Sequence, residues 1–376
     1  MKISISNRKT GDQKSPVLFL SKEVHMDETL VEYKEKELIA SKKTPTIIHS
    51  IVDDIQSEEC SSVNITIVHH NDMDGIFSAL MIRELLKTFD SPKIDIHYVE
   101  YNYQAGYDLV DKIPLGSEVF IVDLSLTESQ IKNILHRVSN ILIIDHHMTS
   151  IGILKDLIDN DEDIMKRGDL AFYVDVKGCG AMNIYNLFKD VHYKNKNKKI
   201  SDVVNPKTID LVDQYDRWDR KINDYHNCDY LNTYCWESSS LFVNSNIMDK
   251  LLYNRDFLQE ALQVGEELYE LQQQKYKVKF AAFHRKGFFH IDGHIYRVCY
   301  MFGFGNSIAF GDDLNKYDFC MLINRPDMYG NIKVSMYSAE NRVEVNELCE
   351  KLGGGGHPHA AGFSMSSVDE LFKYIQ

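Results

Sequence analysis

The chain has 376 residues, of which 44% are apolar and 26% are charged, the composition of an ordinary globular protein. A chain of this length exceeds what one hydrophobic core usually organises, so we expect two domains. The formal charge of −14 argues against a protein that wraps a long nucleic-acid duplex, because neutralising many phosphates requires a basic surface. A short or small phosphate ligand is compatible with this charge.

The seven cysteines are odd in number and scattered, without CxxC or CxxH spacing. We interpret them as reduced thiols and expect a cytoplasmic protein. No apolar run approaches the roughly 20 residues that a membrane span needs, and the N-terminus lacks the apolar core of a signal peptide. We therefore expect no membrane association.

Residues 1–60 mix short apolar pieces with charged stretches and hold no motif with recognisable chemistry, so we treat them as an N-terminal extension of unknown role. Residues 61–240 form the predicted catalytic domain, in which short β-branched runs alternate with helical patterns. The four runs are 65–68, 93–96, 119–122 and 141–144. Strands that alternate with helices predict an α/β fold with a Rossmann-like parallel sheet covered on both faces.

Three helices are expected in this domain. The first carries its apolar residues on one face between positions 77 and 86, and the second opens with a capping box at Thr127 and Gln130. The third begins after residues 178–180, Gly-Cys-Gly, which would allow close approach to the sheet. The lysine-rich segment 194–199 is predicted to be a solvated connection, with contact to nucleic acid as the alternative.

Residues 241–275 are predicted to contain a linker helix, because apolar residues recur at helical spacing from 258 to 271; an ordinary packed helix is the plain alternative. Aromatic and β-branched runs in residues 276–376 predict a smaller mixed α/β domain. Four consecutive glycines near its end, at 353–356, are entropically costly in a mere turn. Their backbone N–H groups, with His357, are therefore predicted to bind a phosphate or a base edge.

Three of the predicted strands run directly into Asp and His residues, at 69–75, at Asp123 and at 145–147. The carboxyl ends of parallel strands form the ligand crevice of such a sheet, so these side chains should converge. Converging carboxylates repel one another unless cations hold them, and a mixture of oxygen and nitrogen ligands suits manganese better than calcium. A helix N-cap is the alternative for Asp74 or Asp145 taken alone.

A fourth element, residues 211–219, places further carboxylates on a helical pattern beside Trp218, and a charged helix face is its alternative. In order, the segment 70–75 (HNDMDG), Asp123, the triplet 145–147 (DHH) and this downstream Asp resemble the four motifs of the DHH phosphoesterase superfamily. The run GGGGHPHAAGF, 353–363, resembles the signature of the C-terminal DHH-associated domain.

The resemblance covers about residues 63 to 370. The compact first motif and the Tyr-Asp-Arg-Trp run of the fourth are most similar to the nanoRNase branch, which removes nucleotides from very short RNA. Many relatives carry an Arg in the strand before the glycine loop, where this chain has Tyr337. How the terminal phosphate is clamped is therefore left open.

The resemblance also implies a set of metal ligands. His70, Asp72 and Asp123 would hold one divalent cation. The second cation would be held by Asp74, Asp123, His146 and Asp216, with Asp123 bridging and with Asp213 as the fallback for Asp216. The extra histidine, His69, is interpreted as a neighbour of the ligands. Mn²⁺ is the preferred metal, with Mg²⁺ and Co²⁺ as alternatives.

The expected catalytic residues are Asp123, Asp145, which would orient the two histidines that follow it, and His147, which would contact the scissile phosphate. His147, Gly354, Gly355, Gly356 and His357 would bind the substrate.

The site is expected in a cleft between the two domains, where a water activated by two cations would hydrolyse short oligonucleotides to nucleoside monophosphates. The expected partner is short single-stranded RNA or another small nucleotide, and the oligomeric state is open, a homodimer included. The alternatives are a phosphodiesterase for cyclic dinucleotides or phosphoadenosine phosphate, a pyrophosphatase, and an inactive nucleotide sensor.

Overall fold

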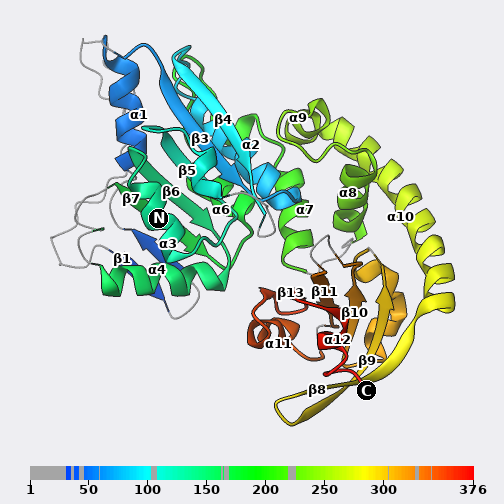
Figure 1. Cartoon of the computed structure of the whole chain (residues 1–376). Coiled ribbons are helices and arrows are strands. Elements are labelled where there is room, and N and C mark those ends of the chain that lie inside the picture. Colours follow the sequence, from blue (N-terminus) through cyan, green and yellow to red (C-terminus); the bar gives the residue numbers. More distant parts are fainter. Residues whose placement is uncertain are drawn as a thin grey trace. The chain divides into compact units, whose positions relative to one another are not determined.

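The computed structural model describes residues 31–34, 38–41, 46–58, 60–102, 108–161, 164, 169–218, 226–303, 305–326, 330–339 and 341–376. Most of the predicted N-terminal extension and Asp219 of the fourth motif thus lie outside the described residues. The chain divides into two compact units, Met1–Gln263 and Val264–Gln376, which we describe separately (Figure 1). The predicted cleft between domains therefore stays a prediction.

The first unit is built on one sheet, in which seven strands among the described residues lie in the order β1-β2-β7-β6-β5-β3-β4. The strands are β1 (Val31–Lys34), β2 (Leu38–Ser41), β3 (Val63–His69), β4 (Ile94–Glu100), β5 (Glu118–Val122), β6 (Asn140–Asp145) and β7 (Leu170–Asp175). Neighbours from β7 to β4 are parallel, whereas β1 and β2 are antiparallel additions at the edge. The predicted Rossmann-like parallel sheet is confirmed.

Helices cover both faces of this sheet, because every central strand is apolar on both sides. Along β5, Phe120 and Val122 face one core while Val119 and Ile121 face the other. The first core packs α1 (Thr46–Gln56), α2 (Met73–Lys87), α6 (Gly180–Phe188), α7 (Pro206–Asp216), α8 (His226–Glu237), α9 (Asn246–Tyr253) and the start of α10 (Arg255–Phe283). The second packs η1 (Leu109–Lys112), α3 (Glu128–Leu135) and α4 (Met148–Asn160).

The predicted helices are confirmed as α2, α3 and α6, and the capping box of Thr127 and Gln130 is present at the start of α3. The helical pattern of 258–271 lies within the longer α10, and that of the fourth motif forms α7. In the first unit, three strands were not predicted, β1, β2 and β7; β1 and β2 belong to the segment that we treated as an extension, and β2 pairs with β7.

The chain order of the strands creates a switch point between β3 and β5. After β3 the chain moves to β4 on one side, and it then returns to form β5 on the other side of β3. Connections that leave neighbouring strands in opposite directions open a crevice at the carboxyl ends of those strands. His69, the last residue of β3, and Asp123, directly after β5, lie at this point.

The second unit contains a six-stranded sheet in the order β12-β13-β11-β10-β9-β8. Its strands are β8 (Arg285–Ile291), β9 (His294–Phe302), β10 (Phe319–Ile323), β11 (Ile332–Tyr337), β12 (Gly355–His357) and β13 (Ala360–Met365). Among the described residues of this unit, β9 and β10 are the one parallel pair, and the unit also holds α11 (Val345–Lys351) and α12 (Val368–Leu371). The predicted smaller mixed α/β domain is confirmed.

All seven cysteines are free thiols, six of them buried. Within the described part of the chain, none of the helices combines the length and the apolar character that a membrane crossing requires.

Candidate metal centre

The first motif forms a tight loop between β3 and α2. Asp72 is the N-cap of α2, where its Oδ1 accepts a hydrogen bond from the Gly75 N–H at 3.0 Å, and its Oδ2 lies 2.7 Å from His70 Nδ1. A Cβ at Gly75 would lie 2.4 Å from the carbonyl oxygen of His70, so only glycine permits this turn. His69 lies apart from this pair, buried, with Nδ1 2.7 Å from the carbonyl of His70.

Asp123 occupies a left-handed backbone conformation, with φ of +55°, directly after β5. Its N–H donates to the carbonyl of Ile144 on the adjacent β6 at 3.0 Å, which holds the residue at the sheet end. Asp is among the few residue types that tolerate this conformation, which still costs of order 1–3 kcal/mol. The backbone thus aims a buried carboxylate into the crevice.

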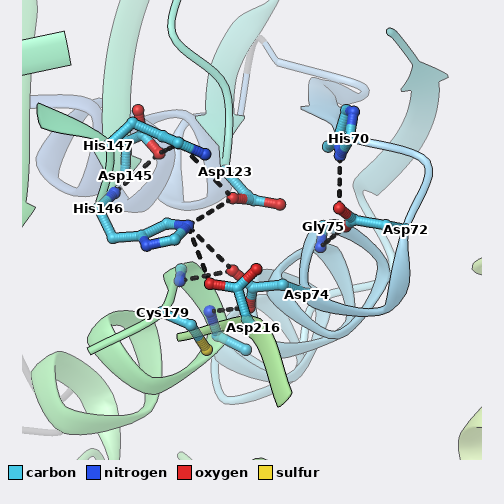
Figure 2. Close-up of polar contacts among 12 residues, drawn as sticks. His70, Asp72, Asp74, Gly75, Asp123, Asp145, His146, His147, Cys179 and Asp216 are labelled. Carbon is cyan, nitrogen blue, oxygen red and sulfur yellow. Dashed lines mark hydrogen bonds and ion pairs between the residues drawn. The ribbon is translucent and has the colours of Figure 1, made fainter. Parts of the chain in front are cut away.

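The DHH triplet begins at Asp145, the last residue of β6, and lies beside Asp123 (Figure 2). His146 Nε2 lies 3.1 Å from Asp123 Oδ1, 3.6 Å from Asp74 Oδ2 and 3.4 Å from Asp216 Oδ2. Asp145, fully buried, accepts from the His146 N–H at 2.7 Å, and its Oδ1 lies 2.8 Å from His147 Nδ1. Asp145 therefore holds both histidines in place.

Asp74 meets the N-terminus of a different helix. The N–H groups of Gly180 and Ala181 at the start of α6 donate to its two oxygens at 2.7 and 2.8 Å. The residue that precedes α6, Cys179, makes no side-chain capping bond, so Asp74 serves as the cap. A Cβ at Gly180 would lie 2.8 Å from Ser78 Oγ and 3.1 Å from Asp74 Oδ2, which explains the need for glycine there.

The two candidate Asp residues of the fourth motif have different surroundings. Asp213 accepts from the Cys179 N–H at 2.7 Å and forms a bidentate pair with Arg217, at 2.9 and 2.6 Å. Asp216 lies instead beside His146 and within the coulombic range of Asp74. The structure thus places Asp216 in the cluster and Asp213 in a contact that joins α6 and α7.

Burial and mutual repulsion shift the pKa values of this cluster. Burial, followed by the charge of Asp216, raises the pKa of Asp74 to about 7, and burial with Asp74 nearby raises the pKa of Asp123 well above its usual value. For His147, burial is the largest influence and acts to lower the pKa, but the charge and hydrogen bond of Asp145 and the charges of Asp216 and Asp74 together raise the pKa to about 9. The cluster therefore favours bound cations and a protonated His147.

The donor atoms form groups that fit divalent cations. One group consists of His70, Asp72 and Asp123, and another of Asp74, His146 and Asp216; within each, the ligand atoms lie within 4.8 Å of one another. Asp123 also lies 3.1 Å from His146, so it stands between the two groups. Carboxylate oxygens with imidazole nitrogens are a donor set that Mn²⁺ and similar divalent ions accept.

The glycine run lies in the second unit, where part of its composition has a structural cause. A Cβ at Gly354 would lie 2.1 Å from the carbonyl oxygen of Gly362 on β13, and Gly356 has φ of +138°. The Gly354 N–H donates to the carbonyl of Cys349 at 2.8 Å. Gly355 and His357 belong to β12, and a role of the run in substrate binding stays a prediction. Tyr337 ends β11 and pairs with Ala360.

Several residues that support the cluster were not predicted from sequence. Ser150 donates to Asp145 Oδ2, and Asn183 Nδ2 donates to the Asp145 carbonyl at 3.1 Å. Their positions on α4 and α6 have no distinctive sequence signal. Gly180 was noticed as a small residue, but the surface it approaches is Ser78 and Asp74 on α2 together with Asp123 after β5.

Comparison with known proteins agrees with this geometry. Residues 64–213 match the family model described as "DHH family, N-terminal domain". Oligoribonuclease NrnB of Bacillus subtilis (strain 168) is 23% identical over 324 residues, which are 81% of this chain and 73% of the relative. The solved DHH domain of a member of the s1p family of ribosomal proteins has 14% identity and a TM-score of 0.54, covering 88% of this chain and 89% of its own.

A further solved structure, RecJ from Thermus thermophilus in complex with Mn²⁺, is 13% identical with a TM-score of 0.49, and it is matched over 88% of this chain and 53% of its own.

Together with the family match, the site defines a hydrolase that acts on phosphodiester bonds. Within that class, residues 64–213 match the DHH family, and the match spans all the sheet-end motifs and reaches Asp213.

The repulsion around Asp123 leads to a prediction about stability. In the metal-free protein at pH 8, Asp123→Asn should raise the Tm by about 2–4 °C, because removing the charge relieves the repulsion between carboxylates. In a unit of this size, each kcal/mol gained in the free energy of unfolding raises the Tm by about that amount. Asparagine also tolerates the left-handed backbone. Mn²⁺ at about a hundred times its Kd should stabilise the wild type by about 2.7 kcal/mol and the variant much less.

Scanning calorimetry with and without Mn²⁺ measures both effects. Asp156→Asn, the same change at an exposed position of α4, is the matched control and should shift stability by less than about 0.5 kcal/mol. Equal stabilisation of wild type and Asp123→Asn by Mn²⁺ would contradict a metal role for Asp123.

Gly180→Ala should lower the affinity for Mn²⁺ by at least about tenfold, because the new Cβ pushes the α6 N-terminus away from Asp74. Titration calorimetry with Mn²⁺ measures the loss. Gly152→Ala, at an open position on α4, is the control and should leave the affinity unchanged. Adding Ser78→Ala, which removes the closest atom, should recover part of the affinity; no loss in Gly180→Ala would contradict the contact.

Proposed function

We propose that this protein is a metal-dependent phosphodiesterase that hydrolyses short oligonucleotides, such as nanoRNA, to nucleoside monophosphates. The observation that carries the proposal is the placement of Asp123 between two groups of metal-ligand type, at the switch point of the sheet. Two cations held by such groups around one shared carboxylate would neutralise the negative oxygens of a phosphate, which favours a reaction at its phosphorus.

His70, Asp72 and Asp123 would hold one cation, and Asp74, Asp123, His146 and Asp216 the other, with Mn²⁺ preferred. Asp216 is proposed over Asp213, because both oxygens of Asp213 are engaged by Arg217. When bound, the two cations would lower the pKa of a water bound to them toward neutrality and would hold the phosphate oxygens.

The protein's own groups supply orientation and charge. Asp145 fixes the ring of His147 through the 2.8 Å contact, and its charge and hydrogen bond act to raise the pKa of His147. A protonated imidazole can donate to a phosphate oxygen and stabilise the charge that develops on it. His147 is therefore proposed to contact the scissile phosphate, and Asp145 to act through it.

The preference for short substrates is supported by the compact HNDMDG motif, and by the similarity to a relative named an oligoribonuclease. The second unit is proposed to be a DHH-associated domain that binds the substrate through Gly355, Gly356 and His357. Gly354 would act by permitting the close approach to β13 that shapes the loop.

The test is an assay of substrates with Mn²⁺ and with chelator: an RNA dinucleotide, a pentamer, a long single strand and a cyclic dinucleotide. We expect Mn²⁺-dependent release of monophosphates from the dinucleotide and pentamer, and little from the long strand. Asp123→Asn should lower the rate by at least about a hundredfold, whereas Asp156→Asn should not.

The other outcomes separate the alternatives. Turnover of the cyclic dinucleotide alone would replace the proposed substrate while keeping the site. Binding of Mn²⁺ without turnover of any of these substrates would contradict the proposal and favour a nucleotide sensor.

A further inference from the structure

The first unit contains a cavity of about 890 Å³ that shares no residue with the candidate metal centre. It is bounded by the C-terminal end of α2, the edge strand β4, the lysine-rich segment after α6, and Tyr253 at the end of α9. Asp74 and Lys87 lie at opposite ends of α2, which separates the two sites by about 20 Å along the helix.

One wall of this cavity is a closed polar network around Glu84, which is only 2% exposed. The hydroxyls of Tyr193 and Tyr253 both donate to the Glu84 carboxylate, and Lys87 Nζ lies 3.1 Å from Glu84 Oε2. Burial, and then the charge of Glu84, raise the pKa of Tyr253, which keeps its hydroxyl protonated. The negative charge of Glu84 is thus satisfied within the wall.

Two lysines and Asp90 contribute charge to the rim of the cavity, and Asp90 is hydrogen-bonded to Asn195. Lys196 and Lys198 line the cavity and are exposed, and neither forms an ion pair with any residue that the structure describes. The segment that carries them is fixed in place: Lys194 N–H donates to the Thr88 carbonyl at 2.9 Å, and Asn195 Nδ2 donates to Asp90 at 2.6 Å. Two exposed lysines therefore line a cavity in a protein whose net charge is −14.

Asp90 and Ser91 also line the cavity, and the rest of its wall is apolar. Leu86, Ile94, Ile96 and Val203 line the cavity, and both isoleucines belong to β4, where they stay only partly buried. A cavity of this size with apolar walls and a few polar groups has the character of a small-molecule site. A bare anion would leave these walls in contact with water, and an uncharged ligand would leave Lys196, which lies over the ring of Tyr193 at 5.4 Å, and Lys198 without an anionic partner.

We propose that this cavity binds a nucleoside phosphate: the lysines would take the phosphate, and the aliphatic walls the base. The ligand is either a free mononucleotide or one nucleotide of a single-stranded oligonucleotide. This site lies outside the metal centre, so the proposal does not depend on the proposed catalytic function.

The test is equilibrium binding of adenosine 5′-monophosphate to the full chain in chelator, which keeps divalent cations out of the metal centre. Lys196→Ala with Lys198→Ala should weaken binding by about tenfold, and raising the salt should weaken the wild type toward the same affinity. Lys275→Ala with Lys277→Ala removes the same charge from exposed positions of α10 and should leave the affinity unchanged.

Adenosine and inorganic phosphate serve as partial ligands, and each should bind more weakly than the monophosphate. Ile96→Trp, which fills the cavity from β4, should also abolish binding, and the lysine pair decides the matter if that variant fails to fold. Hydrogen exchange should show ligand-dependent protection in residues 84–96 and 193–203.

A 5′-phosphorylated adenylyl dinucleotide distinguishes the two sources. Lysine-dependent binding tighter than that of the monophosphate identifies an oligonucleotide segment, and equal or weaker binding identifies the free mononucleotide. Equal affinity of the wild type and the Lys196/Lys198 variant for the monophosphate would overturn the proposal, as would phosphate binding as tightly as the monophosphate.

Discussion

The main constraint on this structure is the repulsion between carboxylates that the fold buries near the carboxyl ends of the central strands. Asp74 and Asp123 are almost fully buried, and Asp216 lies beside them, all within reach of the single imidazole of His146. Such a cluster is unstable in the ionised state unless positive charge compensates it. The protein supplies part of that charge through the N-terminus of α6, whose first two N–H groups donate to Asp74, and divalent cations would supply the rest.

The backbone is arranged to keep these groups together. The switch point between β3 and β5 places the first motif beside Asp123, and the left-handed φ of Asp123 turns its carboxylate into the crevice. Gly75 and Gly180 allow two chain segments to approach more closely than any other residue would permit. Beside this centre, Asp145 orients the ring of His147, and Arg217 pairs with the carboxylate of Asp213. Without these contacts, the His147 ring and the Asp213 carboxylate could pair with other groups. Positioning by rigid neighbours is what metal-dependent phosphoryl chemistry requires of a protein.

Much of this site could be predicted from the sequence, because buried parallel strands have a strong β-branched signal and their carboxyl ends converge by topology. Clustering of the first motif, Asp123 and the DHH triplet followed from that rule alone. The distinction between Asp213 and Asp216 was open, although Arg217 stands four residues after Asp213 and such spacing favours an ion pair on a helix.

Other features were beyond sequence reasoning for physical reasons. The short strand β2 is held by its pairing with β7, a partner more than a hundred residues away in the chain. The contact of Gly180 with α2 depends on where two helices cross, and the cavity assembles Glu84, Tyr193 and Tyr253 from three separate elements. Local patterns do not contain such long-range contacts.

The most direct test of the central claim is anomalous diffraction from crystals of the protein grown with Mn²⁺. The account predicts two anomalous peaks that share Asp123, one also in contact with His70 and Asp72 and the other with Asp74, His146 and Asp216. A single peak, or peaks that do not contact Asp123, would contradict the claim that two cations hold this carboxylate cluster together.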